Sequence, residues 1–110
     1  MDVIEVWTNC ADRAEARRIG DALVEERLVA SANVYAEIES RYHWKGEVVA
    51  ATEVPLLLKT TAALGDAVEA RIRAPHSYET PAILRRRVDE VNDDYSAWIF
   101  AETTEALREH

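Results

Sequence analysis

The segment APHSYETPAI, residues 74–83, gathers several side chains that could do chemistry: a histidine, a tyrosine and a glutamate between two prolines. An imidazole can bind a transition metal, transfer a proton or hydrogen-bond the backbone of a turn. His76 and Glu79, with Glu53 from an earlier segment, are our candidate ligands for a weakly bound divalent cation, Cu²⁺ or Zn²⁺. The alternative for His76 is a turn residue between a helix and a strand, which the flanking prolines favour.

The sequence favours neither a tight metal site nor an enzyme active site. Closely spaced cysteine or histidine pairs usually mark structural metal sites, whereas Cys10 is the single cysteine and His43, His76 and His110 lie far apart. There is no nucleophile elbow and no glycine-rich phosphate loop. We therefore expect no tightly bound cofactor, no catalytic residue and no enzymatic activity.

Further candidates could line a ligand cleft. The rings of Tyr42, Trp44 and Tyr78 each carry one polar group, which suits an inter-subunit cleft and also a core. Lys59 stands at the end of a predicted strand, just before a helix. Its ammonium group could hold a small anion near the amides of that helix, or it could pair with one of the candidate carboxylates.

The segments that must position these residues follow the order β-α-β-β-α-β, with one more helix at the end. In chain order we expect a strand at 3–8, a helix after Asp12, an extended segment over 36–44, a turn at Lys45 and Gly46, a returning strand at 48–59, a helix capped by Thr60 or Thr61, a strand at 81–88 and a helix capped by Asn92. This α+β order is the ferredoxin-like pattern. The chain forms one domain, 1–110, of which about 103–110 is polar and is expected to fray.

Two local patterns refine this prediction. Asp12 and Glu15 fit a capping box, in which each side chain accepts a free N–H of the first helical turn. Pro55 within the returning strand cannot donate to a ladder, so it indicates an edge or a bulge. Because strands of about a dozen residues are long for a small domain, we expect the hairpin to project and pair with another chain. The alternative is a hairpin folded over its own domain.

Composition limits the partners and the compartment. Twenty-one acidic and thirteen basic residues give a net charge of −8, which repels nucleic acids and anionic membranes. No apolar run approaches the length of a transmembrane helix. The N-terminal residues lack the pattern of a signal peptide, and a single cysteine cannot form an intrachain disulfide. We expect a cytoplasmic protein with no nucleic-acid or membrane partner.

Four dispersed segments carry a more specific signal: YHWKGE at 42–47, LLKTT at 57–61, HSYETP at 76–81 and YSAWI at 95–99. In order and spacing they resemble the signature segments of the CutA family of divalent-cation tolerance proteins. The resemblance implies a ferredoxin-like subunit in a compact homotrimer, close in architecture to the PII signalling proteins, with the long hairpin strands pairing between subunits. It also implies a role in tolerance to copper and other divalent cations.

The sequence departs from that family pattern at several positions. Ser31 stands where the family usually has a cysteine, Ser77 where it has a proline, and Asn92 near a usual glycine. Members linked to copper carry a first-strand cysteine near the position of Trp7. Cys10 follows that strand in our prediction, so the family's thiolate chemistry does not transfer to it.

Our leading hypothesis is a homotrimeric CutA-type protein that responds to metal ions and binds divalent cations weakly at clefts between subunits. One alternative is a PII-like regulatory module that binds a small anion, another small molecule or an unidentified protein partner. The other is a trimeric scaffold without a ligand.

Overall fold

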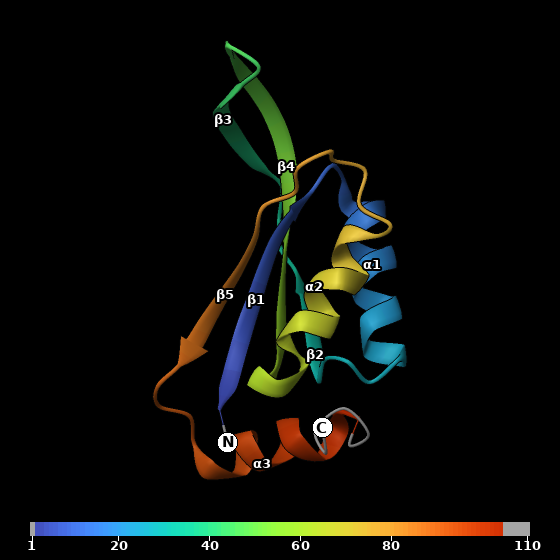
Figure 1. The fold of residues 1–110 in the computed structure, drawn as a ribbon, viewed down its shortest axis with the longest axis vertical. Coiled ribbons are helices and arrows are strands. Elements are labelled where there is room, and N and C mark those ends of the chain that lie inside the picture. The colour runs from blue at the N-terminus through green and yellow to red at the C-terminus, as the bar shows by residue number, and fades with distance from the viewer. Residues whose placement is uncertain (1, 105–110) are drawn as a thin grey trace.

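The computed structural model describes residues 2–104. Its five strands form an antiparallel sheet in which the order β2-β4-β1-β5 makes the main path and β3 pairs with the far part of β4. The elements are β1 (Val3–Cys10), α1 (Arg13–Glu25), β2 (Ser31–Val34), β3 (Ile38–Trp44), β4 (Glu47–Thr61), a 3₁₀ turn (Ala62–Leu64), α2 (Gly65–Arg73), β5 (Ile83–Val88) and α3 (Asp93–Glu102). Helices α1 and α2 lie together beside the sheet and α3 crosses one end of it (Figure 1). The predicted ferredoxin-like order with a C-terminal helix is confirmed.

The core lies between the sheet and the helices α1 and α2. Alternate residues of β1, among them Ile4 and Val6, turn toward the helices and are buried, as expected for a strand with one covered face. Leu56 and Leu58 of β4 do the same. The helices contribute a stripe of apolar side chains at helical spacing: Ala16, Ile19 and Leu23 of α1, and Val68 and Ile72 of α2. This spacing can be read in the sequence, and it marks the faces that the structure buries.

The start of α1 differs from the predicted capping box in one detail. The carboxylate of Asp12 accepts the N–H of Glu15 at 2.8 Å, as predicted. Glu15 does not return this bond to Asp12; its carboxylate accepts the N–H of Ala11 at 2.9 Å and turns inward toward the loop after α2. This carboxylate is therefore a buried structural group as well as part of the helix start.

The predicted long strand before the hairpin turn is two strands, β2 and β3, which both pair with β4. The break at residues 35–37 lies opposite Pro55, whose carbonyl accepts the N–H of Tyr35 at 2.9 Å. Pro55 lies in an interior strand and pairs with Asn9 of β1, so the edge interpretation is wrong. The missing N–H instead interrupts the ladder on the side of β2 and β3.

Lys45 and Gly46 form the hairpin turn with φ angles of 50° and 82°. Two successive positive φ angles are the geometry of the tight turns that match the twist of a hairpin. Beyond the break, β3 and the first part of β4 extend away from the rest of the sheet (Figure 1). The projecting hairpin that the sequence indicated is thus present in the subunit.

Thr61 and Asn92 occupy the predicted N-cap positions, but neither makes a side-chain cap bond. Thr61 precedes the 3₁₀ turn but makes no side-chain cap bond, and Thr60 instead donates its hydroxyl to the carbonyl of Leu28 at 2.6 Å. Asn92 precedes α3, but its amide donates to the side chain of Asp94 rather than capping the helix. Across residues 2–104, no helix is long and apolar enough to span a membrane. The predicted frayed tail lies mostly outside the described residues.

Candidate functional site

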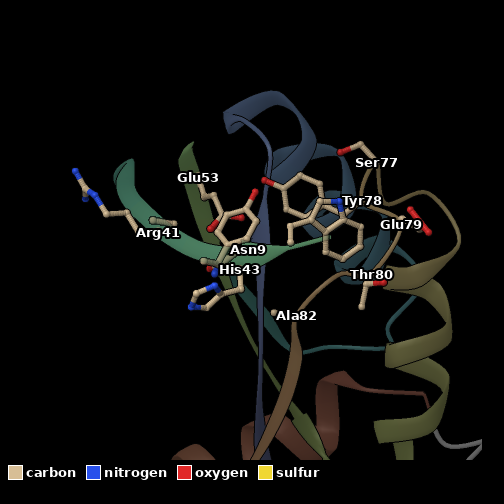
Figure 2. Close-up of a pocket in the computed structure, with 12 residues that line it drawn as sticks. Asn9, Arg41, His43, Glu53, Ser77, Tyr78, Glu79, Thr80 and Ala82 are labelled. Atoms are coloured by element: carbon tan, nitrogen blue, oxygen red, sulfur yellow. The ribbon is translucent and has the colours of Figure 1, made fainter. Parts of the chain in front are cut away.

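A cavity of about 720 Å³ lies between the β3–β4 hairpin and the loop that joins α2 to β5 (Figure 2). Strand β3 contributes residues 40–44, and β1 and β4 contribute one residue each. The loop supplies the rest. The lining residues are Asn9, Ser40, Arg41, Tyr42, His43, Trp44, Glu53, Ser77, Tyr78, Glu79, Thr80 and Ala82. We call this cavity the hairpin pocket.

A carboxylate and two phenols form the inner wall of the hairpin pocket. Glu53 is only 6% exposed, and the hydroxyl of Tyr78 hydrogen-bonds to it. Burial raises the pKa of Tyr78 well above its usual value, and the hydrogen bond and charge of Glu53 raise it further, with Tyr42 close by. The phenol of Tyr78 therefore stays protonated and donates to the carboxylate of Glu53, which lines the pocket.

At the outer rim, Glu79 pairs with Lys45 of the hairpin turn across 3.4 Å. Both side chains are more than two-thirds exposed, and pairs of this kind contribute little stability. The ammonium group of Lys45 also lies 5.5 Å from the ring centre of Trp44. The carboxylate of Glu79 is thus an exposed anionic group at the entrance, on the opposite side of the pocket from Glu53 in Figure 2.

His76 does not line the hairpin pocket, and its side chain is fully buried behind the loop. Its Nδ1 accepts the N–H of Tyr78 at 3.2 Å, so Nε2 carries the proton and donates to the carbonyl of Asn9 at 3.0 Å. The Thr8 hydroxyl lies 3.4 Å from the same nitrogen. The ring therefore ties the loop to the end of β1, which is the turn role offered as the alternative for this residue.

The predicted residues thus fall into three places. Glu53, Glu79, Tyr42, Trp44 and Tyr78 meet in the hairpin pocket. His76 lies directly behind Tyr78, with ring centres 4.9 Å apart. Lys59 lies elsewhere on the sheet and donates to the amide oxygen of Asn33 at 3.0 Å, so neither candidate carboxylate is its partner.

Two features of this region were not predicted from the sequence. His43 lines the hairpin pocket, although it was not among the candidate ligands. Cys10, Glu15 and His76 form a buried cluster in which one ligand atom from each lies within 4.8 Å of the others. No sequence spacing indicates this cluster, because its members come from the end of β1, the first turn of α1 and the loop after α2.

The surroundings of the buried cluster shift the pKa values of Cys10 and Glu15 in opposite directions. Burial raises the pKa of the Cys10 thiol to about 12, with the nearby charges of Glu15 and Asp12 adding to the effect. Burial alone would also raise the pKa of Glu15, but hydrogen bonds from the N–H of Ala11 and from the hydroxyl and N–H of Ser77 lower it below the usual 4.5. At neutral pH the carboxyl is ionised and the thiol is protonated.

Comparisons with known proteins show to which family the chain belongs. The family model described as CutA1 divalent ion tolerance protein matches residues 4–102. The chain belongs to the CutA1 family. It is 39% identical over 101 residues to the divalent-cation tolerance protein CutA of Pyrococcus horikoshii, covering 92% of this chain and 98% of the relative.

Solved CutA structures agree with the fold. CutA1 from Oryza sativa superposes with a TM-score of 0.92 at 28% identity, covering 96% of each chain. CutA from Xylella fastidiosa superposes with a TM-score of 0.91 at 32% identity, covering 94% of this chain and all of the other. The protein from Archaeoglobus fulgidus, described as the periplasmic divalent cation tolerance protein CutA, gives 0.88 at 29% identity, covering 91% and 97%. The resemblance found in the sequence is confirmed, and the relatives from Pyrococcus horikoshii and Archaeoglobus fulgidus are named for tolerance of divalent cations.

Proposed function

We propose that this CutA1-family chain acts in the cytoplasm as a non-enzymatic homotrimer in the response to metal ions. It binds divalent cations such as Cu²⁺ weakly at the hairpin pocket, which a neighbouring subunit completes. Related proteins named for divalent-cation tolerance support the general role. The observation that carries the site is the buried carboxylate of Glu53, which faces a pocket lined by further oxygen and imidazole groups.

The donor set of the hairpin pocket suits a weakly held cation. Carboxylates attract any divalent ion, and an imidazole shifts the preference toward Cu²⁺ and Zn²⁺. Glu53 provides a fixed charge because Tyr78 hydrogen-bonds to it, while Glu79 and His43 stand on more exposed elements. Only part of this set is preorganised, and the cation must compete with Lys45 for Glu79. Low affinity follows from both facts.

Exposed apolar side chains on the hairpin support an assembly. Ile38, Tyr42 and Trp44 are each 38% exposed and Val48 is 69% exposed. Apolar groups clustered on one projecting element mark a surface that another chain covers. A second and a third copy would cover these groups and close the open side of the hairpin pocket. Light scattering should then give three times the chain mass of 12.4 kDa, whereas a monomer at micromolar concentration would contradict the assembly.

Calorimetric titration with Cu²⁺ and Zn²⁺ tests the site. We expect the Glu53→Gln variant to bind at least tenfold more weakly than the wild type, a loss of about 1.4 kcal/mol. Glu79→Gln should give a smaller loss because its carboxylate is exposed and already paired with Lys45. Glu25→Gln removes an exposed carboxylate from α1, a helix that contributes no residue to the pocket lining, and serves as the matched control.

The set of variants separates the outcomes. Weaker binding in the two pocket variants with unchanged binding in the control supports the site. Equal binding in all four proteins would remove the hairpin pocket from metal binding. Flat titrations in the wild type would favour the interpretation of the protein as a scaffold without a ligand.

A further inference from the structure

The carboxylate of Glu53 is buried without a cationic partner at the inner wall of the hairpin pocket. Only 6% of Glu53 is exposed, and the hydroxyl of Tyr78 donates a hydrogen bond to it. Within residues 2–104, no lysine, arginine or histidine side chain forms an ion pair with this carboxylate. Buried charges in proteins are normally paired with an opposite charge. The pocket therefore contains a fixed negative charge that a positively charged ligand can neutralise.

The aromatic lining and the size of the hairpin pocket suit an organic cation. Tyr42 and Trp44 stand two residues apart on β3, so their rings lie on one face of the hairpin. Glu53 pairs with Ile38, four residues before Tyr42, and therefore shares that face. The faces of aromatic rings attract organic cations. The cavity of about 720 Å³ lies within the range of roughly 300–1,000 Å³ that is usual for sites of small organic molecules.

Lys45 shows how an alkylammonium group is held at the entrance of the pocket. Its Nζ lies 3.4 Å from the carboxylate of Glu79 and 5.5 Å from the ring centre of Trp44. Because Lys45 and Glu79 are both more than two-thirds exposed, their pair is weak and easily exchanged. Glu79 and Glu53 lie on opposite sides of the pocket (Figure 2). A ligand with two ammonium groups can therefore reach both carboxylates.

We propose that the hairpin pocket binds a linear diamine or polyamine, with one ammonium group at Glu53 and another at Glu79. The inner ammonium group donates hydrogen bonds to the buried carboxylate, and the methylene chain lies against the rings of Tyr42 and Trp44. The outer ammonium group takes the place of Lys45. Such amines are protonated at neutral pH, as a lysine side chain is. This ligand class goes beyond the function proposed above; it uses the same pocket, but its binding does not require a metal ion.

The charges around the pocket favour a ligand with more than one positive charge. The net charge of −8 attracts polycations to the protein. The guanidinium group of Arg41 extends away from Tyr78 and Glu79 in Figure 2, so it does not occupy the space between the two carboxylates. An anionic ligand would instead meet the uncompensated charge of Glu53. Charge therefore separates a polyamine from a nucleotide or a carboxylic acid as the occupant.

Calorimetric titration of the full chain with putrescine, cadaverine and hexamethylenediamine tests the proposal, after treatment with a chelator and dialysis to remove metal ions. Each diamine is compared with the alkylamine of the same carbon number. The best diamine should bind at least about tenfold more tightly than its monoamine, which can reach only one carboxylate. Equal affinity for diamine and monoamine, or no binding of any diamine at millimolar concentration, would overturn the proposal without recourse to any variant.

Variants assign the contacts of the best diamine. Glu53→Gln should weaken its binding at least about tenfold, and Trp44→Leu about fivefold. Trp44→Phe keeps an aromatic face and should lose less. Lys45→Asn removes the competing ammonium group and should bind the diamine more tightly; asparagine tolerates the positive φ of 50° at this position. Glu25→Gln changes the net charge equally and should bind as the wild type does.

The outcomes separate a built site from diffuse attraction. Light scattering confirms that each variant keeps the wild-type mass. Equal losses in Glu53→Gln and Glu25→Gln would show general attraction to an acidic surface and contradict the site. Unchanged binding in Trp44→Leu of wild-type mass would contradict the aromatic contact.

The same variants distinguish the diamine from the metal ion. His43→Ala removes an imidazole of the proposed metal site, so it should weaken Cu²⁺ binding and leave diamine binding unchanged. Trp44→Leu should do the reverse. A protein that binds the diamine but no metal supports this inference and contradicts the metal site proposed above. A protein that binds Cu²⁺ at Glu53 but no diamine overturns this inference and leaves the metal site standing.

Discussion

His76 should hold the loop between α2 and β5 through two hydrogen bonds, one at each ring nitrogen. Variants that keep only one of these bonds can measure how much each contributes to stability. The His76→Ala variant leaves the carbonyl of Asn9 and the N–H of Tyr78 without their buried partners. Each unsatisfied group costs about 1–3 kcal/mol, and the lost ring contacts add to this. We expect a loss of about 3–4 kcal/mol in the free energy of unfolding, a large share of the 5–15 kcal/mol of a typical domain.

Two further variants divide this loss. In His76→Asn the side-chain oxygen lies near the place of Nδ1 and can still accept the N–H of Tyr78. In His76→Gln the side-chain amide lies near the place of Nε2 and can still donate to Asn9. Each should therefore lose about half as much as His76→Ala, roughly 1.5–2 kcal/mol, because one of the two buried groups keeps its partner.

Urea unfolding followed by tryptophan fluorescence and circular dichroism gives these free energies at one matched protein concentration, since an oligomer gains stability with concentration. The exposed His43 provides the control, and His43→Ala should change stability by less than about 0.5 kcal/mol. If His76→Ala unfolds with nearly wild-type stability, or if the Asn and Gln variants equal the Ala variant, the two hydrogen bonds do not hold the loop as described.

Three other predictions follow from the environment of single residues. The folded-state pKa of Glu15 is lowered, so its stabilising effect is full above pH 4.5 and is lost as the pH falls through the folded value. Urea unfolding should show Glu15→Gln less stable than the wild type at pH 7, and the difference should shrink as the pH falls below 4.5. The raised pKa of about 12 leaves almost no thiolate at Cys10, so an aromatic disulfide reagent at pH 8 should react only after urea unfolds the chain. Gly46→Ala should lower the unfolding free energy by about 1 kcal/mol, because φ is 82° although no atom lies near the new Cβ.

Periodicity in the sequence predicted most of the fold because the packed faces of its elements are regular. The helical spacing in α1 and in α2 defines one apolar face on each helix, and the structure buries both. The hairpin turn was predictable because Gly46 favours positive φ angles. Local sequence patterns predicted the helix caps less well. Thr60 finds a better acceptor in the distant carbonyl of Leu28 than in its own helix, and a contact of that kind has no local signal.

The candidate sites depended on contacts that sequence spacing does not encode. Glu53 and Tyr78 are 25 positions apart, and they meet because the loop after α2 passes over the start of the hairpin. Burial then separated two residues that the sequence placed in one ligand set. His76 lies inside with both ring nitrogens bonded, and Glu53 faces the hairpin pocket. Residue type alone could not distinguish an enclosed imidazole from one that faces a ligand.

Tyr78 connects the two sides of the loop. Its backbone N–H holds Nδ1 of His76, and its hydroxyl holds the carboxylate of Glu53. A His76 variant that cannot accept this N–H should loosen the loop, and the change would reach the phenol through the same residue. Such a variant should therefore also change the affinity of the hairpin pocket for a cation.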